Sequence, residues 1–230
     1  MSKKAARRRD DSVRQSFIVP RNRKQDEYLR AIARNNITVA TGPAGTGKTY
    51  LAAATAAMAY DRGEVTSIQI TRPIVEAMGE DLGYLPGDLN EKCDPYLRPI
   101  FDGLREAWGQ GALDCMLKNK TVEISPLAYM RGRTFKNAFI IADEFQNASS
   151  EQVLMLMTRI GEGSKIVMTG DPMQRDRQVD GLEDARRFLS DCPGIAFVDF
   201  GIEEVVRHET VTEVLRRWDT IGVPGIVLST

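Results

Sequence analysis

The residues best suited to chemistry begin with a glycine-rich octapeptide that fits the pattern G-x-x-x-x-G-K-T. In order, it consists of Gly42, Pro43, Ala44, Gly45, Thr46, Gly47, Lys48 and Thr49. Glycines allow backbone N–H groups to point at phosphate oxygens, Lys48 suits the β- and γ-phosphates, and the Thr49 hydroxyl suits Mg²⁺. The apolar strand expected before it and the helix after it favour a nucleotide site over a chance match or a loop without turnover.

Two consecutive carboxylates, Asp143 and Glu144, follow the apolar run at residues 139–142. A buried strand would deliver them at its carboxyl end, where ligands bind in open α/β sheets. Asp143 would hold the Mg²⁺ shell, and Glu144 would act as the general base that polarises water. A kinase needs an acceptor hydroxyl at this place, so the pair favours hydrolysis; a capped surface turn is the alternative.

Two amides extend the predicted site towards the γ-phosphate. Gln146 lies two residues beyond the predicted base and could report whether the γ-phosphate is present. Gln174 closes a Gly-Asp-x-x-Gln stretch that follows the apolar run at residues 165–169, and it could orient water or couple hydrolysis to movement. Asp171 and Pro172, taken alone, are typical of an ordinary turn.

The composition is that of a soluble globular protein. Hydrophobic residues make up 42% of the 230 residues and charged residues 27%. No apolar run approaches the ~20 residues that span a bilayer, and the N-terminus lacks the apolar stretch of a secretion signal. We therefore expect a cytoplasmic protein. Three distant cysteines and one histidine predict neither a disulfide framework nor a multi-histidine metal site.

The charge distribution is uneven along the chain. Residues 1–24 carry nine basic and two acidic side chains, a net +7, whereas the whole chain has a net charge of −1. Such a segment suits a basic, disordered arm that grips phosphate backbones, although a solvated terminus without a partner fits the composition equally well. We expect residues 25–230 to form a single ATPase domain.

Hydrophobic periodicity predicts an α/β fold with a mostly parallel central sheet. Predicted strands span Ile37–Thr41, Ser67–Thr71, Thr121–Ile124, Ala138–Ala142, Lys165–Thr169 and Ile195–Phe200. Two predicted helices span Gln25–Asn35 and Lys48–Tyr60. A third starts near Ser149 with a capping box, and a fourth spans about Glu203–Trp218. In the last helix, Val206, Val214, Leu215 and Trp218 would form a buried stripe.

In this order, the octapeptide, the acid pair and the Gly-Asp-x-x-Gln stretch resemble the motor domain of superfamily 1 helicases. More narrowly, the chain resembles the PhoH-like family, the phosphate-starvation-inducible ATPases of bacteria and phages. The resemblance spans about Gln25 to Trp218. Its most specific stretches are Thr71–Pro73, Gly83–Asp88, Asp94–Pro99, Pro126–Thr134 and Val205–His208. Phe145, Met173 and Arg175 depart from the family pattern and put local coupling around Gln174 in doubt.

The resemblance implies a three-layer, RecA-like P-loop fold, ATP and Mg²⁺ as ligands, and single-stranded nucleic acid, with RNA favoured, as the polymer partner. It also implies that Gln25 reads adenine with its amide, whereas a solvated helix-start residue is the plain alternative. Arg72 would correspond to a nucleic-acid contact, and a surface ion pair is its alternative.

A single motor domain lacks the second domain that supplies an arginine to bound ATP in two-domain helicases. Such an arginine accelerates hydrolysis by roughly 10³–10⁵ and can come from a neighbouring subunit. We therefore expect a homo-oligomer, and the resemblance implies a hexameric ring. The candidates for this arginine finger are Arg131, Arg133 and Arg207, while His208 suits a structural hydrogen bond.

Two other functions remain open at this stage. A metabolic P-loop kinase would transfer phosphate to a small molecule, which Glu144 and Gln174 argue against. An ATP-dependent scaffold or regulatory module would hydrolyse slowly and would not respond to polynucleotides. The leading hypothesis is an oligomeric ATPase motor that acts on single-stranded nucleic acid.

Overall fold

Six strands form one sheet in the computed structural model, which describes residues 18–73, 89–175 and 181–221, without the side chains of 89–96 and 218–221. The strands are β1 (Ile37–Thr41), β2 (Ser67–Thr71), β3 (Val122–Ile124), β4 (Ala138–Ala142), β5 (Lys165–Gly170) and β6 (Ile195–Asp199). Their order across the sheet is β3-β2-β4-β5-β1-β6, and every pairing is parallel. The parallel sheet predicted from the sequence is confirmed.

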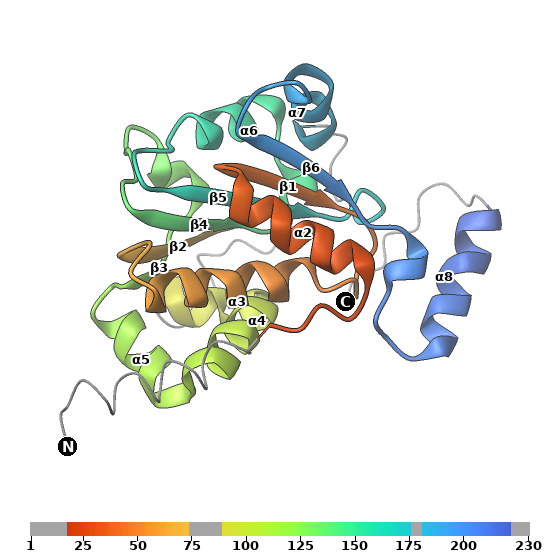
Figure 1. Cartoon of the computed structure of the whole chain (residues 1–230), viewed down its shortest axis with the longest axis horizontal. Helices are drawn as coiled ribbons and strands as arrows, with labels where there is room; N and C mark the ends of the chain where they lie inside the picture. The colour runs from red at the N-terminus through yellow and green to blue at the C-terminus, as the bar shows by residue number, and fades with distance from the viewer. Residues whose placement is uncertain (1–17, 74–88, 176–180, 222–230) are drawn as a thin grey trace.

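Helices cover both faces of the sheet, so the fold has three layers (Figure 1). One face carries α2 (Arg23–Arg34), α3 (Lys48–Asp61), α4 (Leu89–Trp108) and α5 (Gln110–Lys118). The other carries α6 (Ser150–Met157), α7 (Gly181–Leu189) and the 3₁₀ turns η2 (Leu127–Met130) and η3 (Phe145–Asn147). A third 3₁₀ turn, η4 (Ile202–Glu204), precedes the last helix, α8 (Glu209–Ile221).

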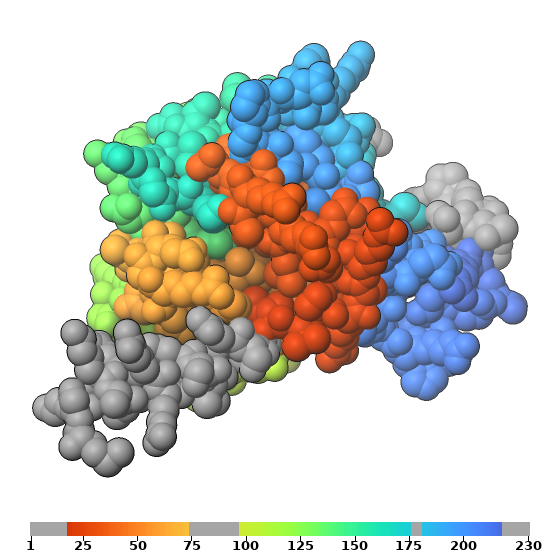
Figure 2. All heavy atoms as spheres, viewed as in Figure 1, coloured from red at the N-terminus to blue at the C-terminus, as the bar shows by residue number. Residues whose placement is uncertain are grey.

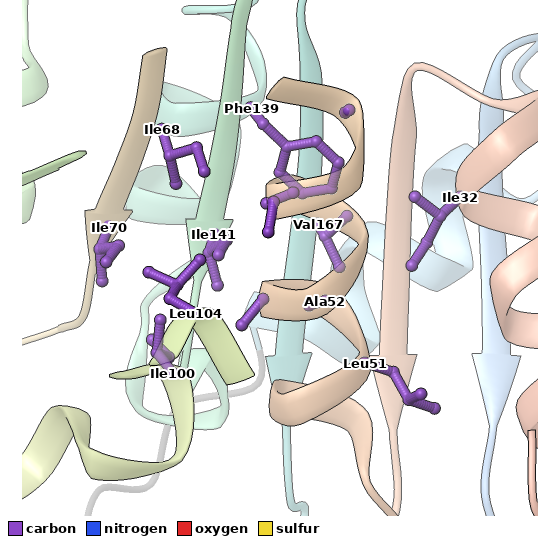
Figure 3. Packing of buried hydrophobic residues seen from close by; sticks show 14 of the residues in the cluster. Ile32, Leu51, Ala52, Ile68, Ile70, Ile100, Leu104, Phe139, Ile141 and Val167 are labelled. Atoms are coloured by element: carbon purple, nitrogen blue, oxygen red, sulfur yellow. The ribbon is translucent and has the colours of Figure 1, made fainter. Parts of the chain in front are cut away.

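Successive side chains along each strand point to opposite faces of the sheet, which divides the core into two apolar clusters. In β4, Phe139 and Ile141 face α3 and α4, whereas Ile140 and Ala142 face α6 and α7. Figure 3 shows the first cluster, in which strand side chains such as Val167 point towards the alanine-rich helix α3. Alanines on α3 let that helix lie close to the sheet, and this close packing fixes the helix start at Lys48.

The last helix differs from its prediction. The sequence predicts one buried helix over residues 203–218, but η4 ends at Glu204 and α8 begins only at Glu209. His208 explains the late start because its Nδ1 accepts a hydrogen bond from the Thr210 backbone N–H (3.2 Å), as a capping residue does. The histidine is thus a structural residue, as expected.

In the predicted apolar stripe, neither Val214 nor Leu215 of α8 is buried, and the side chain of Trp218 lies outside the described residues. Val214 is 56% exposed, and no described side chain of α8 is buried. Figures 1 and 2 show this last part of the chain standing at the edge of the molecule, apart from the sheet. Helical spacing predicted the amphipathic pattern correctly, but a pattern cannot show whether another element packs against it.

The predicted N-terminal arm lies mainly outside the described residues, as does the family stretch Gly83–Asp88. Where the description begins, Ile18 packs against the core, and α2 starts at Arg23 behind the capping residue Asn22. The end of the segment predicted to be an arm is therefore part of the folded body. Within the described ranges, none of the helices has the length and apolar character that crossing a membrane requires.

Candidate functional site

The octapeptide Gly42–Thr49 joins β1 to α3 at the carboxyl edge of the sheet. Gly42 has φ +134°, and a Cβ there would lie 2.2 Å from the carbonyl oxygen of Phe200. Gly45 has φ +86°, and a Cβ there would lie 2.6 Å from Nε of Arg207. Only glycine allows this backbone path, which is the path that turns N–H groups towards an anion.

Lys48 opens α3, and its ammonium group is folded onto the loop that precedes it. Nζ donates to the carbonyl oxygens of Gly42 (2.6 Å) and Pro43 (2.8 Å). Burial lowers the pKa of Lys48 to about 8, against the opposing effects of the Asp171 and Asp143 carboxylates. A cation with few water contacts is therefore fixed where the predicted β- and γ-phosphates would bind.

Asp143 gathers hydroxyl groups from two elements. Its Oδ1 accepts hydrogen bonds from the hydroxyls of Thr49 (2.8 Å) and Thr169. The Asp143 side chain comes from the end of β4, Thr49 from the first turn of α3 and Thr169 from β5. These are hard oxygen donors, the kind that Mg²⁺ prefers, so the predicted pair Thr49 and Asp143 fits this ion.

Glu144 lies just beyond Asp143 in a left-handed backbone conformation, with φ +55°. Its Oε1 is 3.8 Å from Nη2 of Arg72, and its Oε2 accepts a hydrogen bond from the amide of Gln146. Burial and then the Asp143 carboxylate raise the pKa of Glu144, against Arg72 and the Gln146 hydrogen bond. A raised pKa makes this carboxylate a better proton acceptor.

Gln146 connects the acid pair to the loop after β5. Its Nε2 also donates to the backbone carbonyl of Gln174 (3.0 Å), and its Oε1 accepts from the backbone N–H of Asp171 (3.1 Å). Gln146 is 3% exposed, so these bonds fix the orientation of its amide. The structure thus brings Gln146 to the acid pair by its side chain, and Gln174 by its backbone.

Asp171 is a site residue, although the sequence pattern around it is typical of an ordinary turn. Its Oδ2 accepts a hydrogen bond from the backbone N–H of Ala44 (2.9 Å), inside the octapeptide. Burial raises the pKa of Asp171, while the Met173 and Ala44 N–H groups and the charge of Lys48 oppose that rise. The position of Asp171 directly after an apolar strand could have indicated a site residue. That inference requires knowing that this strand lies next to β1, and the sequence does not give the strand order.

Gln25 lies beneath the octapeptide and is 4% exposed, so the solvated helix-start alternative is wrong. Its Nε2 donates to the carbonyl of Thr46 (2.9 Å), and its Oε1 accepts from the backbone N–H of Arg21 (2.8 Å). The oxygen and the nitrogen of the Gln25 amide therefore both hydrogen-bond to backbone groups. The adenine-reading role stays a prediction, and it requires these bonds to be exchanged.

The three candidate finger arginines have different surroundings. Arg133 lies 3.4 Å from Glu123 and stacks over Phe135, contacts that fit its salt-bridge alternative, while its finger role stays a prediction. Arg207 packs on Gly45 of its own chain, where the Val206 N–H also bonds the Gly45 carbonyl (2.9 Å). The finger role of Arg207 stays a prediction. Arg131 is exposed after η2.

Comparison with known proteins shows the family to which the chain belongs. A family model described as "PhoH-like protein" matches residues 17–219. The chain belongs to the PhoH-like family. The PhoH-like protein of Bacillus subtilis is 45% identical over 198 residues, and Protein PhoH of Escherichia coli K12 is 44% identical over 202 residues.

These PhoH-like alignments cover 85% and 86% of this chain but only 62% and 57% of those relatives. The chain therefore spans about three fifths of the length of the relatives that it matches. Family membership confirms the resemblance read from the motifs, while activity and partners of the longer proteins do not follow from this partial overlap.

Among solved structures, the large terminase of a thermophilic bacteriophage in complex with ADP superposes with a TM-score of 0.55. The superposition covers 89% of this chain and 50% of the terminase, at 14% sequence identity. Another crystal form of that terminase gives 0.54. At this identity the likeness concerns the fold alone, and it confirms the P-loop NTPase-like fold of this PhoH-like chain.

Proposed function

We propose that this PhoH-like chain binds ATP with Mg²⁺ and hydrolyses the γ-phosphate. One observation carries the proposal: the oxygens of Thr49 and Asp143 lie 2.8 Å apart beside the octapeptide, and Glu144 follows directly. One edge of the sheet thus carries the phosphate-binding loop, the oxygen donors for a metal ion and a candidate base. A small-molecule kinase would need an acceptor hydroxyl where Glu144 stands.

The residues divide the chemistry among them. Backbone N–H groups from Gly45 to Thr49 and the Lys48 ammonium bind the phosphates, while Thr49 and Asp143 would hold Mg²⁺, whose charge offsets that of the triphosphate when bound. Glu144 accepts a proton from water as the water oxygen bonds to the γ-phosphorus. The bond from that phosphorus to the β–γ bridging oxygen breaks, the bridging oxygen keeps the electron pair, and ADP and inorganic phosphate leave.

The proposed polymer is single-stranded nucleic acid, with RNA favoured over DNA. Support comes from the nine basic residues within 1–24 and from Arg72, whose side chain is 31% exposed at the edge that carries Glu144. A phosphate backbone lying along this edge would approach the ATP site directly. The solved neighbour that contains ADP supports nucleotide binding but not the choice of polymer.

We further propose that the chain acts as a homo-oligomeric motor, a hexameric ring in which a neighbouring subunit supplies an arginine. Arg131 is now the favoured finger, because Arg133 and Arg207 contact groups of their own chain. A ring would also give the exposed Val214 of α8 a surface to pack against.

The deciding experiment is steady-state ATPase with and without single-stranded RNA and DNA, at two salt concentrations. We expect Mg²⁺-dependent phosphate release that RNA stimulates, and a stimulation that weakens with salt because phosphate contacts release counterions. Absence of Mg²⁺-dependent release from ATP would refute the hydrolase. Slow hydrolysis without a polymer response would indicate the scaffold. Deleting residues 1–17, which leaves α2 intact, tests the basic segment.

A further inference from the structure

Arg72 and Glu144 meet because their strands are neighbours. In the parallel pair β2 and β4, Thr71 lies opposite Ala142, and the Asp143 N–H donates to the Thr71 carbonyl (3.0 Å). Arg72 is the first residue after β2, and Glu144 is the second after β4. The sheet register therefore sets the guanidinium beside the candidate base, at 3.8 Å from its Oε1.

Both oxygens of the Glu144 carboxylate already have polar neighbours. Arg72 lies by Oε1, and the Gln146 amide donates to Oε2. The backbone of Glu144 is left-handed, a conformation that is costly outside glycine and that surrounding contacts must hold in place. A general base needs an oxygen that can take a proton from water. These contacts therefore place a polar group beside each of the two oxygens that could take this proton.

The contact to Arg72 is the one that a ligand can exchange. A separation of 3.8 Å is longer than a hydrogen bond, and the side chains of Arg72 and Glu144 are 31% and 29% exposed. A phosphodiester group binds guanidinium through two parallel hydrogen bonds, which this pair lacks. A phosphate at this edge would thus compete well with Glu144 for the Arg72 guanidinium.

We propose that Arg72 is a positioning residue that restrains Glu144 until a backbone phosphate of single-stranded nucleic acid binds its guanidinium. Exchange of the Glu144 contact for the phosphate contact then frees the base and couples polymer binding to ATP hydrolysis. The inference rests on the proposed ATPase function. It adds the residue through which the polymer acts on the chemical step.

The test compares Arg72→Ala and Arg72→Lys with the unmodified chain, with and without single-stranded RNA. Without RNA, we expect Arg72→Ala to raise basal kcat about fivefold or more, the lower end of coupling between linked sites, with KM for ATP unchanged. RNA should then add little further stimulation. Arg72→Lys keeps the positive charge but loses the planar guanidinium that binds phosphate through two hydrogen bonds. Its basal kcat should therefore stay low, and RNA should stimulate it only weakly.

A matched control is Arg62→Ala, because Arg62 also lies 3.8 Å from a glutamate, Glu64, in the segment that precedes β2 at the other end of the sheet. This variant should keep the basal rate and the RNA response. Thermal unfolding of each variant shows whether it is folded. If Arg72→Ala does not fold, the basal rate and RNA response of Arg72→Lys decide the question.

Other outcomes overturn the inference. A lower basal kcat in Arg72→Ala would mean that Arg72 orients Glu144 for catalysis. An unchanged basal kcat with weaker RNA binding would make Arg72 a polymer contact alone. Inorganic phosphate at matched phosphate concentration should not stimulate, and equal stimulation would make the ligand a free anion. If the unmodified chain hydrolyses ATP but does not respond to RNA, the proposed nucleic-acid partner is wrong. The basal rates of the Arg72 variants then still show whether Arg72 restrains Glu144.

Discussion

The carboxylate of Asp171 holds the backbone N–H of Ala44 at 2.9 Å, so the loop after β5 is tied to the phosphate-binding loop. The same aspartate gives its own N–H to the amide of Gln146, which in turn bonds Glu144. One chain of hydrogen bonds therefore runs from the octapeptide to the candidate base. A change at the γ-phosphate position has a direct route to the acid pair through these groups.

Replacing Asp171 should weaken this connection. Asp171→Ala leaves the half-buried N–H of Ala44 without its acceptor, and a donor left unsatisfied in this way costs up to about 1–3 kcal/mol. We expect the free energy of unfolding to fall by that amount in urea titrations, and the affinity for ATP to fall about tenfold, which corresponds to about 1.4 kcal/mol. Met173→Ala is the control, since Met173 is 64% exposed in the same loop. Unchanged ATP affinity in Asp171→Ala would show that the loop holds its shape without this bond.

The two central site residues should separate binding from turnover. Lys48→Ala removes the buried cation that faces the phosphates, so we expect ATP binding to be lost in calorimetry.

Glu144→Gln keeps the shape of the side chain but removes the proton acceptor, so it should bind ATP while kcat falls about 10²–10⁴-fold. Normal turnover by Glu144→Gln would mean that another group activates water.

The motifs confined to one stretch of sequence were predictable, and contacts between distant stretches were not. β1, β2 and β4 have their predicted bounds because each is a short stretch with isoleucine or valine in its interior that ends at a loop. Glycines and Lys48 mark the octapeptide without any knowledge of the fold. In contrast, the Asp171 contact to Ala44 joins residues 127 positions apart, and it depends on β5 lying beside β1. Nothing in the sequence of either segment specifies that order.

Gln25 tests whether a buried amide reads the base or supports the loop. Its bond to the Thr46 carbonyl is buried, and such bonds contribute about 0.5–1.5 kcal/mol. If loop support is its role, Gln25→Ala should weaken ATP and GTP binding equally, by about two- to tenfold. Glu27→Ala, on the same helix and paired with Lys24 at the surface, should change neither affinity. A loss confined to ATP would establish adenine reading instead.

The final prediction concerns the close approach of backbone at Gly42. Gly42 and Gly63 both have positive φ, +134° and +71°, but an added Cβ lies 2.2 Å from the Phe200 carbonyl oxygen at Gly42 and meets nothing within 4 Å at Gly63. Gly63→Ala should therefore cost only the left-handed strain, about 1–2 kcal/mol. Gly42→Ala adds a clash with backbone that cannot rotate away, so its loss should exceed ~3 kcal/mol.

Urea unfolding of both variants measures the difference, and nucleotide binding shows where it acts. Gly42→Ala should lose ATP binding because β1 and the segment after β6 must move apart where the octapeptide begins, whereas Gly63→Ala should bind ATP normally. Equal destabilisation by the two substitutions would mean that Phe200 yields easily. In that case the conformation of Gly42, rather than its contact with Phe200, would be what the loop requires.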